Sequence, residues 1–117
     1  MEDNRIEAIA LLRNHRGSPR KARLVLDMIR GKRVREAKNI LMFSNKRMAE
    51  ATLKLLVSAC SNAYQQNNKI DVDNLIINKA YADGAKIMKR WMPRAKASAS
   101  TILKRSCHIT IGVIENV

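Results

Sequence analysis

The sequence has few aromatic residues, few cysteines and no long apolar run. Aromatic residues occupy 3% of its 117 positions, and Cys60 and Cys107 stand alone, without Cys or His at a zinc-ligand spacing. No apolar stretch approaches the roughly 18 residues that span a bilayer, and Glu2, Asp3 and Glu7 make the N-terminus unlike a secretory signal. These absences argue against a zinc protein, a disulfide-stabilised secreted domain and a membrane protein. We expect a soluble, intracellular chain with reduced thiols.

Acidic residues are scarce as well. Lys and Arg number 23 against 10 Asp and Glu, which gives a formal net charge of +13. A small domain with this imbalance repels itself when it is alone, so we expect a polyanionic partner. Nucleic acid is favoured over a membrane surface, because basic membrane binders usually add the aromatic residues that this chain lacks. With 46% hydrophobic residues, the chain can form one modest core, and we expect a single domain over 1–117.

Residues that could support catalysis or metal binding are isolated. His15 and His108 have no partner nearby in the sequence, and Asp71 and Asp73 fall in a predicted turn, where we interpret them as turn and capping residues. The four glycines are scattered and form no phosphate-binding loop. The sequence therefore predicts no enzyme, no catalytic residue, no metal ligand and no cofactor.

Hydrophobic periodicity predicts one strand, three helices and two further strands, in that order. The helices are expected at 19–30, 34–43 and 46–66, and the strands at 5–13, 74–82 and 106–114. Because strands joined by a hairpin pair antiparallel, we predict an α+β fold, with a small antiparallel three-stranded sheet and three helices on one face. The first strand is expected at an edge, and Tyr81 is expected to pack within the sheet.

Three polar or small residues are predicted to mark helix ends. Ser18, before Pro19, is expected to cap the first helix through its hydroxyl group, and Ser44 is expected to cap the third helix. Gly31 is expected to end the first helix with a positive φ.

Cations crowd the amino end of the first predicted helix, namely Arg16, Arg20, Lys21 and Arg23. The helix dipole disfavours positive charge at this end, so we interpret the cluster as a set of phosphate contacts. The alternative is a solvated face of the helix.

The stretch from Gly84 to Ile114 contains no Asp or Glu. Pro93 and a run of small Ala and Ser residues fit no helix, so we predict a long β-hairpin at about 83–105 that protrudes from a body formed by 1–82 and 106–117. Arms of eight to ten residues would project about 30 Å, at about 3.3 Å per residue. Such a ribbon is marginal in water, so an outside partner must hold it. Because Trp91 lies on the predicted ribbon, we interpret it as a contact with RNA or with a neighbouring protein.

No RNA-recognition aromatic motif, GXXG loop or zinc finger is present, so binding by shape and charge is expected. A DNA-binding architectural protein that uses a basic β-arm is the alternative hypothesis.

Four segments carry a family resemblance. They are SPRKARLVLDMIRGKRVREA (18–37), SACSNA (58–63), MKRWMPRAK (88–96) and ILKRSCHIT (102–110). In order and spacing they resemble bacterial-type large-subunit ribosomal protein twenty-two, from about His15 to Ile114. The resemblance implies a structural constituent of the large ribosomal subunit that binds its ribosomal RNA, supports assembly and lines the nascent-peptide exit tunnel with its hairpin. The implied partners are ribosomal RNA, neighbouring ribosomal proteins and the nascent polypeptide, with no membrane and no DNA.

The basic blocks and the resemblance together predict the site. RNA contacts are expected from Arg13, His15, Arg16, Arg20, Lys21, Arg23, Lys32, Arg33, Lys86, Lys89, Arg90, Arg94, Lys96, Lys104 and Arg105. The tunnel hairpin is expected to comprise Met88, Lys89, Arg90, Trp91, Met92, Pro93, Arg94, Ala95 and Lys96. Ala97-Ser98 replaces the Gly-Arg that the family pattern leads one to expect, and Trp91 stands where an aliphatic residue is usual. The implied location is the cytoplasm, in a bacterial ribosome, with an organellar ribosome as the other possibility.

Overall fold

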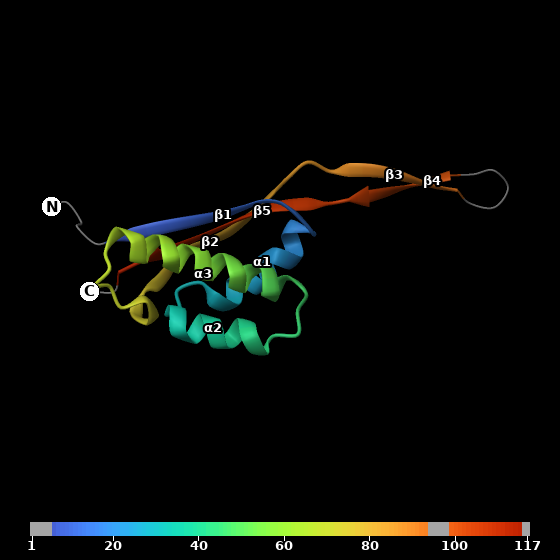
Figure 1. Ribbon diagram of the computed structural model, residues 1–117. Helices are drawn as coiled ribbons and strands as arrows, with labels where there is room; N and C mark the ends of the chain where they lie inside the picture. Colours follow the sequence, from blue (N-terminus) through green and yellow to red (C-terminus); the bar gives the residue numbers. More distant parts are fainter. Residues whose placement is uncertain (1–5, 94–98, 116–117) are drawn as a thin grey trace.

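The computed structural model describes residues 6–93 and 99–115, with side chains for 6–87 and 104–115 (Figure 1). The elements are β1 (Glu7–Arg16), α1 (Pro19–Ile29), α2 (Val34–Phe43), α3 (Met48–Gln66), a 3-10 turn (Val72–Asn74), β2 (Ile76–Gly84), β3 (Met88–Pro93), β4 (Ala99–Lys104) and β5 (Ser106–Ile114). The predicted α+β fold is confirmed, and α2 and β5 have their predicted bounds.

The last strand, β5, lies in the centre of a three-stranded antiparallel sheet with the order β1-β5-β2. Every second residue of β5 is apolar, and this alternation determines which face of the strand meets the helices. The face that the helices cover contains Cys107, Ile109, Ile111 and Val113, which are all fully buried. The first strand is an edge strand, as predicted.

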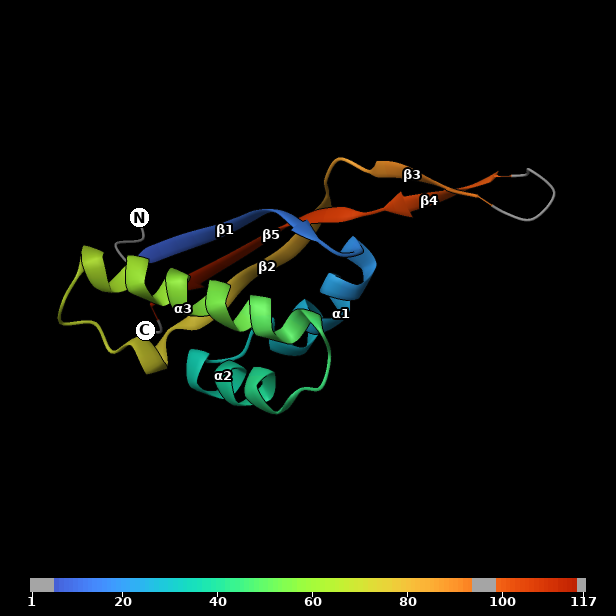
Figure 2. The same ribbon diagram turned by 45° about the vertical axis from the view of Figure 1, so that its right-hand side comes forward.

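The helices lie on one side of this sheet (Figures 1 and 2). α1 packs against β2 and α3 packs against β1 and β5, while α2 packs mainly on α3 as an outer layer. Each helix buries an apolar stripe against the sheet or a neighbouring helix, such as Ala22, Val25, Leu26 and Ile29 on α1. One continuous core forms between the two layers.

Helix ends differ in part from the prediction. Ser18 occupies the N-cap of α1, but among the described residues its side chain makes no capping hydrogen bond. Ser44 Oγ accepts a hydrogen bond from the amide of Lys46 at 3.3 Å. This local turn precedes the helix, so α3 begins two residues later than predicted, at Met48. Gly31 is confirmed as a positive-φ terminator, with a φ of 79°.

The second strand also begins later than predicted, at Ile76 rather than Asn74. Asp71 caps a short 3-10 turn there, since its Oδ1 atom accepts a hydrogen bond from the amide of Asp73 at 3.2 Å. Asp71 and Asp73 are therefore turn and capping residues, as interpreted from the sequence.

The position of Tyr81 differs from the sequence prediction, which expected this residue to pack within the sheet. Its side chain is 46% exposed, so it does not pack within the core. β2 turns its even-numbered Ala80 and Ala82 toward the helices, which places Tyr81 on the opposite face of the sheet.

The two cysteines are buried free thiols, as expected. Burial raises the pKa of both Cys60 and Cys107, because the apolar surroundings disfavour the thiolate. Both thiols therefore stay protonated at neutral pH and act as small apolar side chains.

The hairpin leaves the body as a separate two-stranded sheet (Figures 1 and 2). β3 and β4 pair antiparallel from Met88 with Lys104 to Pro93 with Ala99. At the base, the Ala85 amide donates to the Ser106 carbonyl and the Gly17 amide to the Arg105 carbonyl, both at 3.0 Å. The longest axis of the molecule is 66 Å, against 30 and 22 Å for the others.

Both edges of the body sheet are closed by helix side chains. Arg23 of α1 donates from Nε and Nη2 to the Ala82 carbonyl at 3.1 and 2.9 Å, and Arg30 Nε donates to the Ala80 carbonyl at 3.1 Å. On the other edge, α3 donates from Asn62 Nδ2 to the Ile9 carbonyl at 3.0 Å and from Gln66 Nε2 to the Glu7 carbonyl at 3.1 Å. These bonds occupy carbonyls with which another strand could otherwise pair.

Removing the Arg23 donors tests this edge closure. We expect Arg23→Met to lower the free energy of unfolding by about 1 to 2 kcal/mol, because two charge-assisted hydrogen bonds are lost. Arg20→Met is the matched control, since Arg20 is an exposed cation on the same helix, and we expect a change within about 0.5 kcal/mol. Urea unfolding followed by circular dichroism measures both. Equal stability of the two variants would show that the guanidinium contacts do not hold the edge.

Candidate nucleic-acid interface

A groove of about 1030 Å³ lies where the end of β1, the start of α1 and the first half of α3 meet the base of the hairpin. We call it the cationic groove. It is lined by Leu11, Leu12, His15, Arg16, Gly17, Ser18, Lys21, Arg47, Met48, Glu50, Ala51, Lys54, Leu55, Ser58, Lys104 and Arg105.

The charges of the cationic groove are strongly unbalanced. Its lining contains His15 and six Lys or Arg residues, against a single acid, Glu50. Glu50 Oε1 lies 3.6 Å from Lys54 Nζ, but both side chains are largely exposed, so this ion pair contributes little. The groove therefore has a net positive charge that the described side chains do not neutralise, and it can hold phosphate groups.

A bulge near the end of β1 directs the chain into the cationic groove. The pairing of β1 with β5 shifts between Leu12 and His15, and Asn14 has a φ of 55°. The bulge is held because the Asn14 amide donates to His108 Nδ1 at 3.1 Å. The ring of His108 thus accepts a backbone hydrogen bond across the sheet.

Gly17 brings the chain close to α3 directly after the bulge. Its φ is 152°, and a Cβ atom at this position would lie 3.0 Å from Met48 Sδ. A side chain there would require the flexible end of Met48 to shift, and the positive φ would strain any other residue. Glycine therefore allows the chain to pass close to Met48 at this wall of the cationic groove.

The amino end of α1 adds backbone donors to the same place. Its first turn contains no acidic residue, and Pro19 has no amide hydrogen. The next two amides, of Arg20 and Lys21, have no intrahelical acceptor in an α-helix. Together with the positive end of the helix dipole, they favour an anion beside the cationic side chains.

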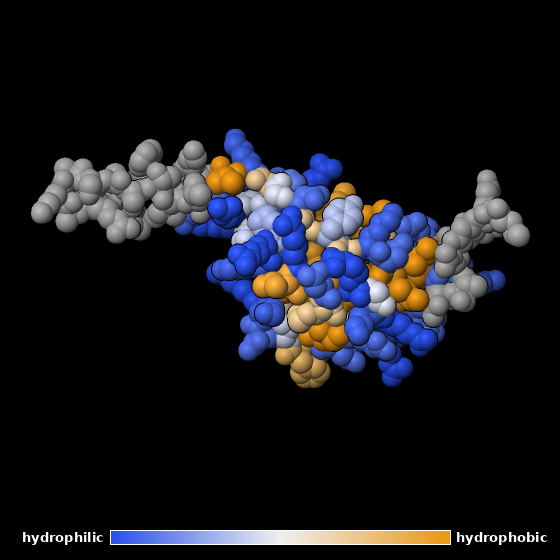
Figure 3. Space-filling model, turned by 180° about the vertical axis from the view of Figure 1, so that it is seen from behind, coloured by the Kyte–Doolittle hydropathy of each residue, from blue (hydrophilic) through white to orange (hydrophobic). Residues whose placement is uncertain are grey.

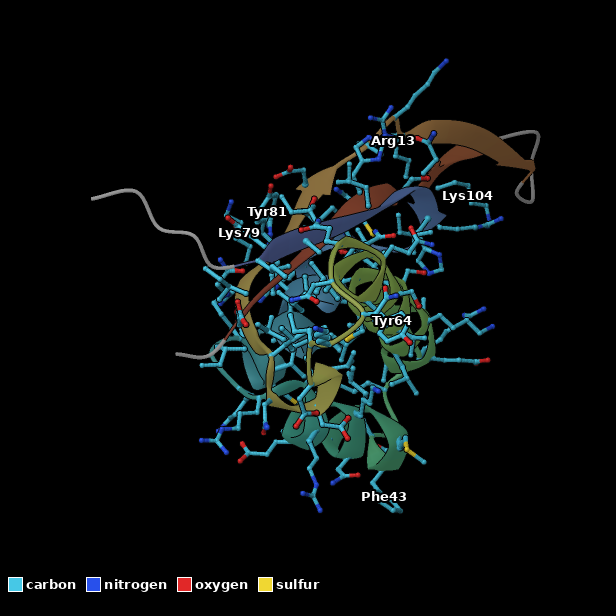
Figure 4. The ribbon with its side chains drawn as sticks, turned by 60° about the vertical axis from the view of Figure 1, so that its left-hand side comes forward. Arg13, Phe43, Tyr64, Lys79, Tyr81 and Lys104 are labelled. Carbon is cyan, nitrogen blue, oxygen red and sulfur yellow. The ribbon has the colours of Figure 1, made fainter. Side chains whose placement is uncertain are left out.

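The structure brings together five of the predicted RNA-contact residues. His15, Arg16, Lys21, Lys104 and Arg105 line the cationic groove, although up to 90 positions separate them in the sequence. Lys104 and Arg13 lie near the base of the hairpin in Figure 4.

Arg47 and Lys54 also line the cationic groove, and sequence reasoning missed them. Both fall in the segment 46–66 that we predicted as the third helix. The adjacent cations Lys46 and Arg47, at the start of that segment, were the available signal. Only the packing of α3 against β1 places them beside the hairpin base.

Other predicted RNA-contact residues lie outside the cationic groove. Arg13, Arg20 and Lys86 are exposed but do not line it, and Arg23 donates to the edge of β2. Lys32 and Arg33 follow the opposite end of α1, about 16 Å away along the helix axis. These cations therefore do not converge on a single site.

The hairpin residues are described only in part. For Met88, Lys89, Arg90, Trp91, Met92 and Pro93 the structure describes the backbone, as strand β3. Arg94, Ala95 and Lys96, together with Ala97-Ser98, lie outside the described residues. Their predicted contacts remain predictions.

Phe43 is a further exposed residue that sequence reasoning did not single out. It ends α2, its side chain is 86% exposed, and it points away from the body in Figure 4. We had no signal for this exposure, because apolar residues at helix ends are usually packed.

The described part of the chain contains neither a cluster of metal ligands nor a membrane-spanning helix. Within residues 6–93 and 99–115, no group of three or more His, Cys, Asp or Glu residues could hold a metal ion. None of the described helices is both long and apolar enough to cross a membrane.

A small basic α+β domain with a cationic groove and a two-stranded ribbon defines a class of protein that can bind polyanions by shape and charge. The model of one family, described as ribosomal protein L22p/L17e, matches residues 10–114. The chain therefore belongs to the L22p/L17e family of ribosomal proteins. It is a structural protein of the large ribosomal subunit, which is a ribonucleoprotein, and the family resemblance found in the sequence is confirmed.

Proposed function

We propose that this chain binds large-subunit ribosomal RNA through the cationic groove and supports assembly of the subunit as a non-catalytic constituent. The observation that carries the proposal is the charge of the groove, where six Lys or Arg residues face one acid that already pairs with Lys54. RNA phosphates are the counterions that a ribosome supplies at high density.

The expected mode of contact is phosphate binding. Arg16 ends β1, Lys21 lies in the first turn of α1, and Arg47 directly precedes α3. Cations from three separate parts of the chain can surround a folded RNA backbone rather than read base edges. Phosphate contacts position a protein on RNA without sequence specificity, and recognition then depends on the shape of the RNA.

The second part of the proposal concerns the hairpin. It lines the nascent-peptide exit tunnel, with Met88 to Lys96 as its distal part, and the nascent polypeptide is a partner. The family resemblance of MKRWMPRAK supports this role. The extension of β3 and β4 away from the body supports it too, since a ribbon of this kind can reach into RNA that the body does not enter.

The DNA-binding alternative gains no support from the structure or from the family match, which indicates a ribosomal protein. We infer a bacterial-type ribosome in the cytoplasm or in an organelle, because the segments 18–37 and 88–96 resemble the bacterial type.

Charge-neutral variants of the cationic groove test the RNA contact. We expect Arg16→Gln with Arg47→Gln to lower affinity for a large-subunit RNA fragment by about tenfold at moderate salt. The slope of log affinity against log salt should fall by roughly one to two, since up to two phosphate contacts are lost. Filter binding over a salt series measures both quantities.

The matched control is Arg35→Gln with Lys69→Gln, which removes the same two charges at exposed positions outside the cationic groove. We expect a much smaller loss of affinity. If both pairs of substitutions reduced the affinity equally, net charge rather than the groove would govern RNA binding.

A shortened hairpin tests the tunnel role. Replacing residues 88–104 by a two-residue Asn-Gly turn should leave the melting temperature of the body within a few degrees, because β3 and β4 form a sheet of their own. Cross-links between an arrested nascent chain and this protein should be lost in ribosomes that contain the variant. If the deletion unfolded the body, or if the nascent-chain cross-links persisted in its absence, the proposal would be contradicted.

A further inference from the structure

The sheet of the body has one face that the helices do not cover. On this outer sheet face, exposed apolar side chains gather beside a few polar ones, such as Asn78. We define it by Ile9 and Leu11 of β1, Thr110 and Gly112 of β5, and Lys79 and Tyr81 of β2. The side chains of Ile9, Leu11 and Tyr81 are 44%, 54% and 46% exposed. Exposed apolar groups gathered on neighbouring strands commonly mark an interaction surface.

The strand register joins these residues into a strip. Leu11, Thr110 and Tyr81 lie directly opposite one another across the three strands. Thr110, in the middle, is only 4% exposed although it lies on the uncovered face. Its neighbours on both sides therefore cover it, as directly opposed side chains in a sheet do.

Lys79 extends the strip across the next row. A Cβ atom on Gly112 would lie 3.1 Å from the Cβ atom of Lys79, so the lysine stem passes over the glycine. Lys79 Nζ then lies 3.0 Å from Glu7 Oε1 on the far strand, β1. The aliphatic stem thus adds apolar surface, while the charge of Lys79 is neutralised within the sheet. Figure 4 shows Lys79 and Tyr81 close together on the side of the sheet away from the helices.

Charge separates this face from the cationic groove. Glu7 and Asp83 balance Lys79 and Arg13 around the strip, whereas the groove has six Lys or Arg residues against one acid. In a chain of net charge +13, a locally balanced apolar surface offers little attraction to phosphates. Its chemistry matches an apolar protein surface of low net charge.

The edges of the sheet restrict how a partner can bind. Edge carbonyls of Ala80 and Ala82 accept hydrogen bonds from α1, and those of Ile9 and Glu7 accept them from α3. Addition of a strand to either edge would have to displace these bonds. A partner must instead pack its side chains onto the outer sheet face.

We propose that the outer sheet face is the docking surface for another protein of the large ribosomal subunit. That protein presents an apolar surface of low net charge, which packs over the strip of Leu11, Thr110 and Tyr81. The proposal goes beyond RNA binding, since it assigns a protein contact to the other face of the sheet. Of the residues that define this face, only Leu11 also borders the cationic groove.

Photochemical cross-linking within intact subunits tests the class of partner. Benzoylphenylalanine replaces Tyr81 in the full chain, which is then incorporated into large subunits, and Tyr64 is replaced in the control. Tyr64 is an aromatic residue of similar exposure, 51%, on α3. We expect the adduct at position 81 to survive ribonuclease and to contain one other subunit protein, whereas position 64 does not yield that adduct. An adduct with RNA, an adduct with a second copy of this chain, or no adduct would overturn the proposal.

Matched substitutions test the contribution of the strip. Ile9→Ser with Tyr81→Ser should reduce the amount of the cross-linked partner in purified subunits by about tenfold. Leu24→Ser with Tyr64→Ser removes one aliphatic and one aromatic side chain at similarly exposed positions on α1 and α3, and should leave the amount of the partner unchanged. Quantitative mass spectrometry gives the amounts. Equal retention or equal loss of the partner in the two variants would contradict the proposal.

Affinity for the RNA fragment, measured on the free variants, separates this proposal from RNA binding. We expect both double variants to bind RNA as the unsubstituted chain does, because neither changes a cation or a residue that lines the cationic groove. The opposite result is a loss of RNA affinity that parallels the loss of the protein partner in the variant of the outer sheet face. This result would place the strip in the RNA interface and contradict the proposed protein contact.

Discussion

The pairing of β5 with both β1 and β2 is the interaction on which the rest of the structure depends. One face of β5 contributes Cys107, Ile109, Ile111 and Val113 to the core beneath the helices. Its other face forms the centre of the outer sheet face, and its first residue follows directly on the hairpin base. One strand therefore connects the core, the ribbon and the uncovered face, because β4 of the ribbon continues through Arg105 into the central strand of the sheet.

The molecule separates its charged and apolar surfaces around this strand. The bulge at Asn14 and the close approach of Gly17 to Met48 bring β1, α1 and α3 together at the hairpin base, where cations gather. Beyond the bulge, the outer sheet face neutralises Lys79 with Glu7. In a ribosome, which contains both RNA and protein, such a division lets the two kinds of neighbour bind to different surfaces.

The sequence predicted what depends on local periodicity, and it missed what depends on packing. Apolar residues alternate so regularly from Cys107 to Val113 that both ends of β5 were predicted correctly. Gly31 was recognised as the end of a helix because glycine readily adopts the positive φ that such an end needs. Ser44 was misjudged because its hydroxyl group serves a turn before the helix rather than the helix itself. Tyr81 and Arg47 were misjudged because only the sheet order and the position of α3 decide which face or groove they reach. The family resemblance supplied the ribosomal role, which periodicity cannot reveal.

The central claim is that the body is held by its own core, whereas the ribbon needs a partner. Amide hydrogen exchange tests it most directly. The account predicts that β5 amides of the free protein exchange only through global unfolding. Amides of β3 and β4 should exchange far faster in the free protein and become protected in the large subunit. Ribbon amides that exchange as slowly as those of β5 in the free protein would contradict the account.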